Sequence, residues 1–246
     1  MKKTALVTGA IGGIGTSICK RLIKDGCLVI GTYRLENKER AMVWQAELSK
    51  EGYECYIYPV DVSDYSSCSN LIEQIKSEFG SVDILINNAG VTSDATIGNM
   101  TVEMWQSVIN TNLNSVFNLS KLVFEIMSEC NFGRIINISS INGQKGQFGQ
   151  ANYAASKSGI YGLTKSLALE GARKGVTVNS ISPGYIATEM LVAMPEKILN
   201  KIINDIPVGR LGLPEEVAEA VSYLASDKAG FVTGSNLAIN GGQHMC

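Results

Sequence analysis

Short apolar runs alternate with stretches of helical periodicity along the whole chain. The apolar runs predict seven strands, at residues 4–8, 27–33, 54–60, 82–86, 133–139, 176–181 and 236–239. Helical spacing of apolar residues predicts helices at residues 14–26, 64–79, 101–130 and 153–173, and from residue 214 onward. This alternation predicts one α/β domain of residues 1–246: a Rossmann-like, doubly wound, seven-stranded parallel sheet with helices on both faces. Ligands of such sheets bind at the C-terminal ends of the strands.

Composition narrows the classes of function. The formal net charge is −2, so no basic field attracts nucleic acid or an acidic membrane surface. The chain has one histidine, His244, and its six cysteines form no Cys-x-x-Cys pair, so we expect no metal site and no histidine-based triad. The first apolar run stops at Gly9, too short for a signal peptide or a membrane span. We therefore expect a cytoplasmic protein with reduced thiols and neither a membrane nor a nucleic-acid partner.

A glycine-rich loop follows the first predicted strand and opens the first predicted helix. Its glycines include Gly9, Gly13 and Gly15. Glycines let the backbone approach a pyrophosphate, and a helix N-terminus presents N–H groups to it. The spacing Gly-x-x-x-Gly-x-Gly differs from the more familiar Gly-x-Gly-x-x-Gly, and a glycine turn without a ligand is the alternative. The position between strand and helix favours a dinucleotide site.

The end of the second strand indicates which nicotinamide dinucleotide is bound. An acidic residue at this turn binds the ribose hydroxyls of NAD, whereas an arginine accommodates the 2′-phosphate of NADP. The chain has Arg34 there, with Arg40 close behind. Because a guanidinium group suits bidentate phosphate binding, we predict NADPH as the cofactor. A solvated loop charge is the alternative interpretation of Arg34.

Two further strand ends carry polar residues. Asp61 and Val62 follow the third strand, where a carboxylate can accept the adenine amino group and an apolar side chain can lie against the ring. The fourth strand ends in Asn-Asn-Ala-Gly, which includes Asn88 and Gly90. Small and amide residues suit both close ligand approach and a structural turn, so both interpretations of this motif stay open.

The segment from Ser140 to Lys157 carries the chemistry that we predict. Tyr153 and Lys157 are four residues apart in a predicted helix and therefore share one face. A lysine ammonium beside a phenol, together with a cationic cofactor ring, favours a lower phenol pKa, closer to the working range of a general acid. Ser140 follows the apolar run of the fifth strand, where its hydroxyl can hold a carbonyl oxygen that Tyr153 protonates. The same spacing also occurs by chance, with a solvated lysine near a half-buried tyrosine. The accompanying motifs therefore decide whether Tyr153 and Lys157 are interpreted as a catalytic pair.

Two other segments constrain the site. Asn112 lies among apolar residues of the helix predicted at 101–130, where an amide needs a partner. A local bend with a bound water is one explanation, and a plain polar contact is the other. Residues 189–213 are rich in Met and Ile and follow the sixth strand without a clean strand of their own. We expect a mobile lid there.

Taken together, these motifs resemble those of the short-chain dehydrogenase/reductase family in order and spacing, over essentially the whole chain. The matching residues are Thr8-Gly9-x-x-x-Gly13-x-Gly15, Asn87-Asn88-Ala89-Gly90, Asn112, Ser140, Tyr153-x-x-x-Lys157 and Pro183-Gly184. The resemblance implies an oxidoreductase that transfers a hydride from a nicotinamide cofactor to a ketone.

The resemblance also implies a function for each catalytic residue. Tyr153 would donate the proton to the ketone oxygen, and Ser140 would hold that oxygen. Lys157 would lower the pKa of Tyr153 and hold the nicotinamide ribose, and Asn112 would keep a water that links Lys157 to solvent. Cofactor contacts are implied for Gly9, Gly13, Ile14, Asp61, Val62, Asn88, Gly90, Tyr153, Lys157, Pro183, Gly184, Ile186 and Thr188.

Within the family, residues 137–150, 182–188 and 210–216 look most like NADPH-dependent acetoacetyl-CoA reductases of polyhydroxyalkanoate synthesis. This likeness implies reduction of acetoacetyl-CoA to 3-hydroxybutyryl-CoA, with a 3R product, by a homotetramer. Acyl-CoA contacts are then implied for Asp94, Ser140, Gln147, Phe148, Gln150 and Tyr185. Those relatives carry basic residues near positions 99 and 195, where this chain has Asn99 and Pro195.

Two other functions remain as alternatives. A 3-oxoacyl-acyl-carrier-protein reductase of fatty-acid synthesis has the same fold and the same four catalytic residues. An acidic carrier protein should seek basic residues beside the site, but residues 128–132 contain none and the next base is Arg134, which favours CoA. A dinucleotide-binding protein without turnover is less favoured, because such proteins usually lose the tyrosine or its lysine.

Overall fold

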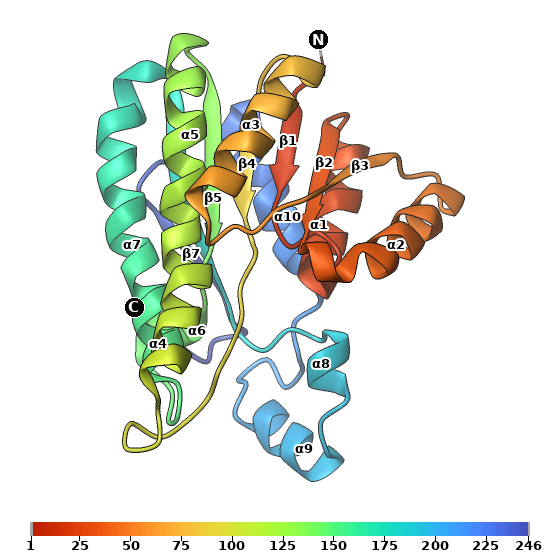
Figure 1. Cartoon of the computed structure of the whole chain (residues 1–246). Coiled ribbons are helices and arrows are strands. Elements are labelled where there is room, and N and C mark those ends of the chain that lie inside the picture. The colour runs from red at the N-terminus through yellow and green to blue at the C-terminus, as the bar shows by residue number, and fades with distance from the viewer. Residues whose placement is uncertain (1, 246) are drawn as a thin grey trace.

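The computed structural model describes residues 2–245, apart from the side chain of residue 190 (Figure 1). Within these residues, seven strands form one sheet in the order β3-β2-β1-β4-β5-β6-β7, and all neighbours are parallel. The strands are β1 (Thr4–Val7), β2 (Leu28–Tyr33), β3 (Cys55–Pro59), β4 (Ile84–Asn87), β5 (Gly133–Ile138), β6 (Val176–Pro183) and β7 (Asn236–Ile239). The predicted seven-stranded parallel sheet is confirmed.

The order of the strands reverses beside β1. The chain builds outward from β1 through β2 to β3, then returns to place β4 on the other side of β1 and continues to β7. Because every strand is parallel, all C-terminal ends lie at one edge of the sheet. The reversal between β1 and β4 is the point at which open α/β sheets bind their ligands.

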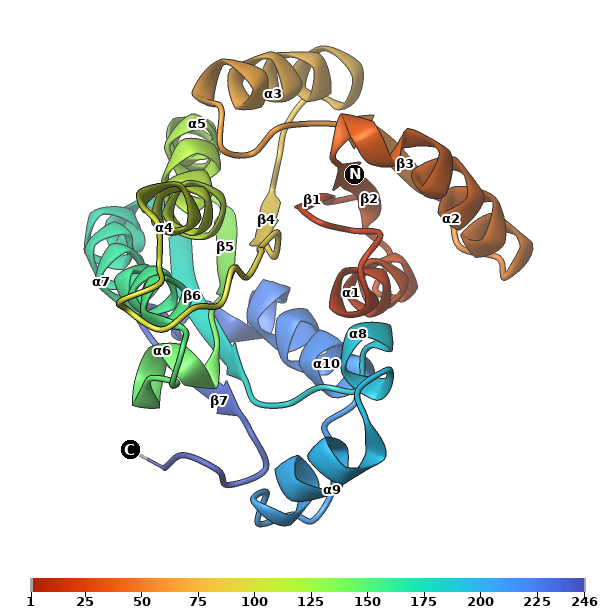
Figure 2. The same cartoon turned by 60° about the horizontal axis from the view of Figure 1, so that its bottom comes forward.

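Helices cover both faces of the sheet, as Figure 2 shows. The helices are α1 (Gly13–Lys24), α2 (Lys38–Lys50), α3 (Tyr65–Phe79), α4 (Val102–Ile109), α5 (Ser115–Glu129), α6 (Ile141–Lys145), α7 (Ala151–Gly171), α8 (Glu189–Val192), α9 (Glu196–Asn204) and α10 (Pro214–Ala225). Short 3-10 turns add η1 (Leu35–Asn37), η3 (Ala172–Lys174) and η4 (Asp227–Ala229). No helix in the described part of the chain has the length and apolar character needed to cross a bilayer.

Alternate residues of β1 face two separate parts of the core. Ala5 and Val7 pack with α1 and α10 on one face, where Ile18 contributes to the cluster. Leu6 faces the other way, into a cluster built with α3 and α5, to which Leu119 belongs. This alternation follows from the two-residue period of a strand, and it confirms the predicted two-sided arrangement.

Several helical segments differ from the sequence-based prediction, among them α8 and α9, which were not predicted. The single helix expected at 101–130 is divided by a π-helical turn, η2 (Asn110–Asn114). Helix α2 was not predicted, because within it only Ala41, Trp44 and Leu48 are buried and its apolar face is narrow. Helix α6 was not predicted either, since five residues are too few to show a helical period.

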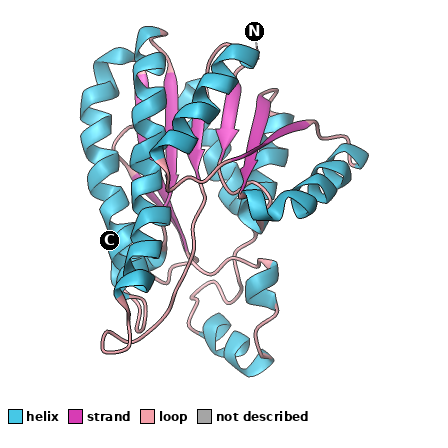
Figure 3. Ribbon diagram, in the orientation of Figure 1, coloured by secondary structure: helices cyan, strands magenta, loops and turns pink. Residues whose placement is uncertain are grey.

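Residues 189–213 stand apart from the sheet at its C-terminal edge, as Figures 1 and 3 show through α8 and α9. The backbone N–H of Ala187 donates to the carbonyl of Gly212 at 2.8 Å, and the N–H of Gly212 donates to the carbonyl of Tyr185 at 2.9 Å. The two ends of the segment are therefore held together by backbone hydrogen bonds where it leaves the sheet and where it returns. The described part of it contains no strand, as expected, and a mobile lid remains our prediction for it.

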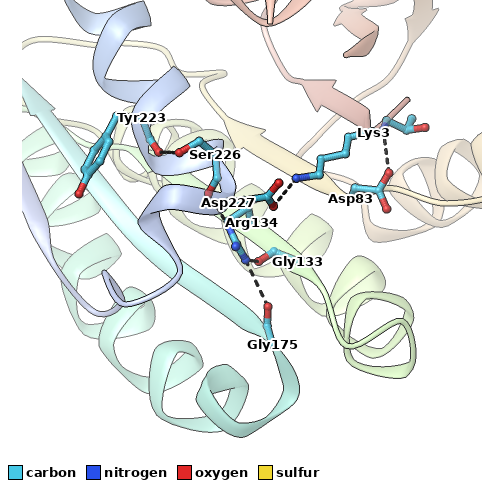
Figure 4. A network of polar contacts seen from close by, with 9 residues as sticks. Lys3, Asp83, Gly133, Arg134, Gly175, Tyr223, Ser226 and Asp227 are labelled. Atoms are coloured by element: carbon cyan, nitrogen blue, oxygen red, sulfur yellow. Dashed lines mark hydrogen bonds and ion pairs between the residues drawn. The ribbon is translucent and has the colours of Figure 1, made fainter. Parts of the chain in front are cut away.

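A buried arginine lies at the opposite, N-terminal edge of the sheet (Figure 4). The side chain of Arg134, which is 5% exposed, donates to the carbonyl oxygens of Gly133 at 2.8 Å, Gly175 at 3.3 Å and Ser226 at 3.3 Å. It joins the start of β5 to the turns before β6 and after α10. The first base after residues 128–132 is therefore a structural group rather than a surface charge.

Candidate active site

The glycine-rich loop joins β1 to α1 at the C-terminal edge of the sheet. Gly9 has a φ of 62°, in the left-handed region that favours glycine. A Cβ at Gly15 would collide with the carbonyl oxygen of Gly9, and a Cβ at Gly13 would lie 3.1 Å from the Thr188 side chain. The loop depends on glycine for its shape, and it forms one wall of a cavity at the N-terminus of α1.

Asn88 fastens this loop to the end of β4. Its Nδ2 donates to the carbonyl oxygens of Thr8 at 2.9 Å and Gly9 at 3.2 Å, and its backbone N–H donates to Oγ1 of Thr8 at 2.9 Å. The Asn-Asn-Ala-Gly motif thus has the architectural function that the sequence left open. Asn88 and Gly90 also line the cavity, so the motif can serve a ligand as well.

Two adjoining cavities follow the C-terminal edge of the sheet. The larger, of about 800 Å³, lies at the reversal of strand order, and the smaller, of about 310 Å³, lies at the ends of β5 and β6. They share Ile14, Asn88, Gly90, Val91, Tyr153 and Thr188, so they form one cleft. The predicted cofactor residues that line it are Gly9, Gly13, Ile14, Arg34, Arg40, Asp61, Val62, Asn88, Gly90, Tyr153, Lys157, Pro183, Gly184, Ile186 and Thr188.

The far end of the larger cavity presents two guanidinium groups and a carboxylate. Arg34 forms an ion pair with Glu36 at 3.1 Å, and Arg40 lies 3.4 Å from a carbonyl oxygen of the glycine-rich loop. Asp61 accepts both the Oγ–H of Ser63 at 2.6 Å and its N–H at 3.0 Å, and these bonds hold the pKa of Asp61 below its usual value. An ionised acceptor and two cations in one cavity fit an adenosine carrying an extra phosphate.

Ser140, Tyr153 and Lys157 meet in the smaller cavity. Ser140 follows β5 and caps α6, where its Oγ accepts the N–H of Asn142 at 3.1 Å and also hydrogen-bonds Tyr153. Lys157 donates to the carbonyl oxygen of Ile138 at 2.8 Å, and its Nζ lies 5.7 Å from the centre of the Tyr153 ring. The structure therefore brings together three side chains that the sequence spaces over 18 positions.

Burial sets the pKa values of this group. Burial raises the pKa of Tyr153, with Asp94 and Tyr161 adding to the rise, while the hydrogen bond with Ser140 opposes it. Burial also lowers the pKa of Lys157 to about 8, because its ammonium has left water. Among the protein groups, desolvation of the phenol outweighs the favourable contacts around it. A lower pKa of Tyr153 through Lys157 together with a cationic cofactor ring remains a prediction.

Asn112 lies in the π-helical turn η2 and is fully buried. Its Oδ1 accepts the N–H of Val91 at 2.8 Å, and its Nδ2 donates to the carbonyl of Val91 at 2.9 Å. The plain polar contact expected from the sequence is present, and the helix is locally distorted. A Cβ at Gly90 would lie 3.3 Å from Oδ1 of Asn112 and 3.5 Å from Nζ of Lys157, so glycine keeps space between these two groups. A water in that space remains a prediction.

The residues predicted at the substrate fall into two sets. Tyr185 and Ser140 line the smaller cavity. Gln150 donates to Asp94 at 2.8 Å and accepts from Asn142 at 2.9 Å, which joins the loop after β4 to the loop before α7. The second set does not line either of these two cavities: Asp94, Gln147, Phe148 and Gln150.

Two polar residues next to the site were missed by the sequence analysis. Asn142 contacts both Ser140 and Gln150. Tyr161 lies two helical turns beyond Tyr153, and its hydroxyl is 3.0 Å from the carbonyl oxygen of Ser140. Residues 153, 157 and 161 are spaced four apart and so share one helix face, and this spacing could have predicted that Tyr161 lies near the site.

Comparisons with known proteins agree with this geometry. A family model described as enoyl-(acyl carrier protein) reductase matches residues 9–244. An acetoacetyl-CoA reductase of Rhizobium meliloti is 54% identical over 246 residues, and one of Allochromatium vinosum is 50% identical over 245 residues, each covering 100% of both chains. A 3-oxoacyl-[acyl-carrier-protein] reductase of Haemophilus influenzae is 44% identical over 243 residues, covering 99% of this chain and 98% of that protein.

Proposed function

The chain belongs to the short-chain dehydrogenase/reductase family, and from that membership we propose that it reduces acetoacetyl-CoA to 3-hydroxybutyryl-CoA with NADPH. The meeting of Ser140, Tyr153 and Lys157 at one cleft carries this proposal. Full-length relatives that are named acetoacetyl-CoA reductases support the substrate. By resemblance to them, we propose the 3R product and a place in polyhydroxybutyrate biosynthesis.

NADPH, when bound, supplies the hydride for the ketone carbon. Ser140 donates a hydrogen bond to the ketone oxygen and fixes the direction of that oxygen. Tyr153 transfers its proton to the same oxygen. The raised pKa of Tyr153 keeps the phenol protonated until that transfer. Lys157, with a pKa of about 8, is positively charged at neutral pH and stabilises the phenolate that Tyr153 becomes. Asn112 holds the loop that carries Val91 beside Lys157, where a water would return the proton.

A tyrosine variant tests this mechanism. Tyr153→Phe removes the proton donor but keeps the ring, so we expect kcat to fall by about 10²–10⁴-fold. The Kd of NADPH, measured by fluorescence titration, should stay within a few-fold, because the ring and Lys157 remain. Turnover at the wild-type rate would remove Tyr153 from the mechanism.

The preference for NADPH rests on Arg34 and Arg40 at the far end of the cleft. Arg34→Ala should weaken NADPH by roughly tenfold, the loss of one charge-assisted hydrogen bond, and leave NADH unchanged. Glu36→Gln is the matched variant: it frees Arg34 from its ion pair and should lower the KM for NADPH. Comparing kcat/KM for NADPH and NADH in all three proteins measures this, and a wild-type preference for NADH would refute the assignment.

The alternative substrate is a 3-oxoacyl group on acyl carrier protein, which the 44% identical relative keeps open. The buried position of Arg134 supports CoA, because residues 128–134 then offer no free base to an acidic carrier. Rates with acetoacetyl-CoA and with acetoacetyl-carrier-protein, measured side by side, decide between them. A strong preference for the carrier protein would reverse the proposal.

We also propose a cytoplasmic homotetramer whose residues 189–213 close over the substrate. Apolar side chains exposed on α4, α5 and the edge strand β7 support self-association; they include Trp105, Phe117 and Leu237. Sedimentation velocity at micromolar concentration tests the assembly, and a monomer at that concentration would contradict it.

A further inference from the structure

The hydroxyl of Tyr161 reaches the backbone of Ser140 from within the fold. Tyr161 lies on α7, on the face that carries Tyr153, and its Oη is 3.0 Å from the carbonyl oxygen of Ser140. The same Oη lies 2.9 Å from Oγ of Ser182, a fully buried residue of β6. No motif of the chain includes Tyr161, and the proposed mechanism does not use it.

The contact continues to the edge of the sheet. Oγ of Ser182 lies 2.7 Å from Oδ1 of Asn236, and Oγ of Ser180 lies 2.9 Å from the same atom. Asn236 belongs to β7, the last strand of the sheet. A row of hydrogen-bonding groups thus runs from Ser140 through Tyr161 and Ser182 to the edge strand.

The acceptors of this row show where Tyr161 donates. The carbonyl of Ser140 and Oδ1 of Asn236 only accept, while Tyr161 and Ser182 carry one proton each. Tyr161 donates to the carbonyl oxygen of Ser140, and Ser182 donates to Oδ1 of Asn236. Both acceptors are served in this arrangement.

Ser140 is thereby held at both of its oxygen atoms. Its carbonyl oxygen also accepts the N–H of Gly143 at 3.0 Å, and its Oγ accepts the N–H of Asn142 at 3.1 Å. The hydroxyl hydrogen of Ser140 remains free for Tyr153 or for a ketone. A small rotation of the Ser140 peptide would move that hydroxyl away from Tyr153, and Tyr161 resists this rotation.

We propose that Tyr161 is a positioning residue, which orients Ser140 through its main-chain carbonyl and so keeps the Ser140 hydroxyl on Tyr153. The inference rests on the proposed functions of Ser140 and Tyr153 and adds a residue that supports them. It acts on the reaction through Ser140 and does not touch the reacting atoms.

Tyr161→Phe removes the donor and keeps the ring. We expect kcat to fall about tenfold, the effect of one hydrogen bond on the barrier, with the KM for NADPH within twofold. Tyr223→Phe is the matched control: this tyrosine is 49% exposed on α10, and its variant should keep the wild-type kcat. A kcat for Tyr161→Phe within twofold of wild type would overturn the proposal.

A double-mutant cycle separates positioning from general structural damage. In a Ser140→Ala background, Tyr161→Phe should cost less than twofold, because the hydroxyl that it orients is gone. The same tenfold loss in both backgrounds would show that Tyr161 acts elsewhere, and would overturn the proposal. Melting temperatures of all variants show whether each one folds.

The pH dependence of kcat gives an independent test of whether Tyr161 positions Ser140. Ser140 from the end of β5, Asp94 from the loop after β4, and Lys157 and Tyr161 from α7 face Tyr153. The hydrogen bond with Ser140 lowers the pKa of Tyr153, whereas Tyr161 itself raises it. Tyr161→Phe should therefore move the basic limb of kcat to higher pH if it loosens Ser140; a lower or unchanged limb would contradict the proposal.

Failure of the proposed substrate is distinguishable from failure of this inference. If acetoacetyl-CoA is not reduced but another ketone is, the substrate proposal fails and the cycle is measured with that ketone. If Tyr153→Phe keeps full turnover, the mechanism fails, and the inference about Tyr161 is overturned with it. If Tyr153→Phe is inactive and Tyr161→Phe is normal, only the inference about Tyr161 is wrong.

Discussion

Arg134 and Lys157 are buried cations held at opposite ends of the same strand, β5. Arg134 donates to three backbone carbonyls at the N-terminal edge (Figure 4). Its guanidinium also stacks 4.4 Å from the centre of the Phe132 ring. Lys157 donates, among the described residues, to one carbonyl, that of Ile138, and its Nζ faces a cavity. Burial lowers the pKa of both groups.

The difference lies in what the remaining N–H groups face. Within the described residues, all the hydrogen bonds of the Arg134 side chain go to backbone carbonyls of the fold, and they connect β5 to neighbouring turns. The ammonium of Lys157 keeps donors that point into a cleft, where a ligand or a phenolate can receive them. A buried cation with few internal partners is costly, and such a group indicates function when it lines a cavity.

The largest effect should come from Lys157→Met, which keeps the length of the chain and removes the charge. We expect kcat/KM to fall by about 10²–10⁴-fold. The melting temperature should hold or rise, because a desolvated charge is replaced by an apolar group. Lys165→Met, an exposed lysine on the same helix, is the control and should leave both quantities unchanged. A stable Lys157→Met enzyme with wild-type activity would break the comparison.

Arg134→Met should show the reverse pattern. Three carbonyls lose their donor, so we expect the free energy of unfolding to fall by about 3 kcal/mol, with kcat per folded site within twofold. Urea unfolding followed by circular dichroism measures the first quantity, and a steady-state assay measures the second. Arg173→Met removes an exposed arginine near the same turn and should cost far less. Loss of activity without loss of stability would contradict a structural function for Arg134.

The pH dependence of stability should separate the two cations further. The folded pKa of Lys157, about 8, lies below its ordinary value of 10.5, so between these values the unfolded state binds more protons. Stability therefore rises with pH across this window, by about 2 kcal/mol relative to the Lys157→Met variant. Arg134→Met should show no such difference, because a guanidinium group stays protonated there. Unfolding free energies at pH 7.5 and 10 check this, and parallel curves for wild type and Lys157→Met would refute it.

The smallest effect should come from Asp227→Asn, which breaks the ion pair with Lys3 beside Arg134. The two charges are 2.5 Å apart, but their side chains are 33% and 77% exposed. Solvent screens such a pair, so we expect a loss of about 0.5 kcal/mol or less. A loss as large as that of Arg134→Met would mean that the ion pair, rather than the carbonyls, stabilises this edge.

Most of the fold could be predicted because buried parallel strands have a strong sequence signal. A strand such as β5, covered on both faces, is a continuous apolar run, and the glycine-rich loop that follows β1 has few alternative structures. Lys157 could be placed beside Tyr153 because helical spacing fixes that relation. These features depend on local sequence alone.

The features that escaped prediction depend on distant contacts. Helix α2 lies at the rim of the sheet with few buried residues, so its pattern is weak. The row from Tyr161 to Asn236 joins residues 75 positions apart, which no local pattern encodes. The depth at which Tyr153 is buried, which raises its pKa among the protein groups, could not be predicted either, because spacing shows the nearby cation but not burial.

The π-helical turn η2 contains one residue more than a regular turn, and this extra residue sets the phase of the helix that follows. One residue corresponds to ~100° of rotation about the axis. Deleting any one of residues 110–114 would restore a plain helix across 102–129, but it would rotate either the Asn112 amide away from Val91 or the apolar stripe of α5 away from the sheet. A single inserted residue thus fixes the orientation of the Asn112 amide toward the cleft and of the apolar face of α5 toward the core. No one side-chain substitution can restore both orientations after an in-frame deletion there.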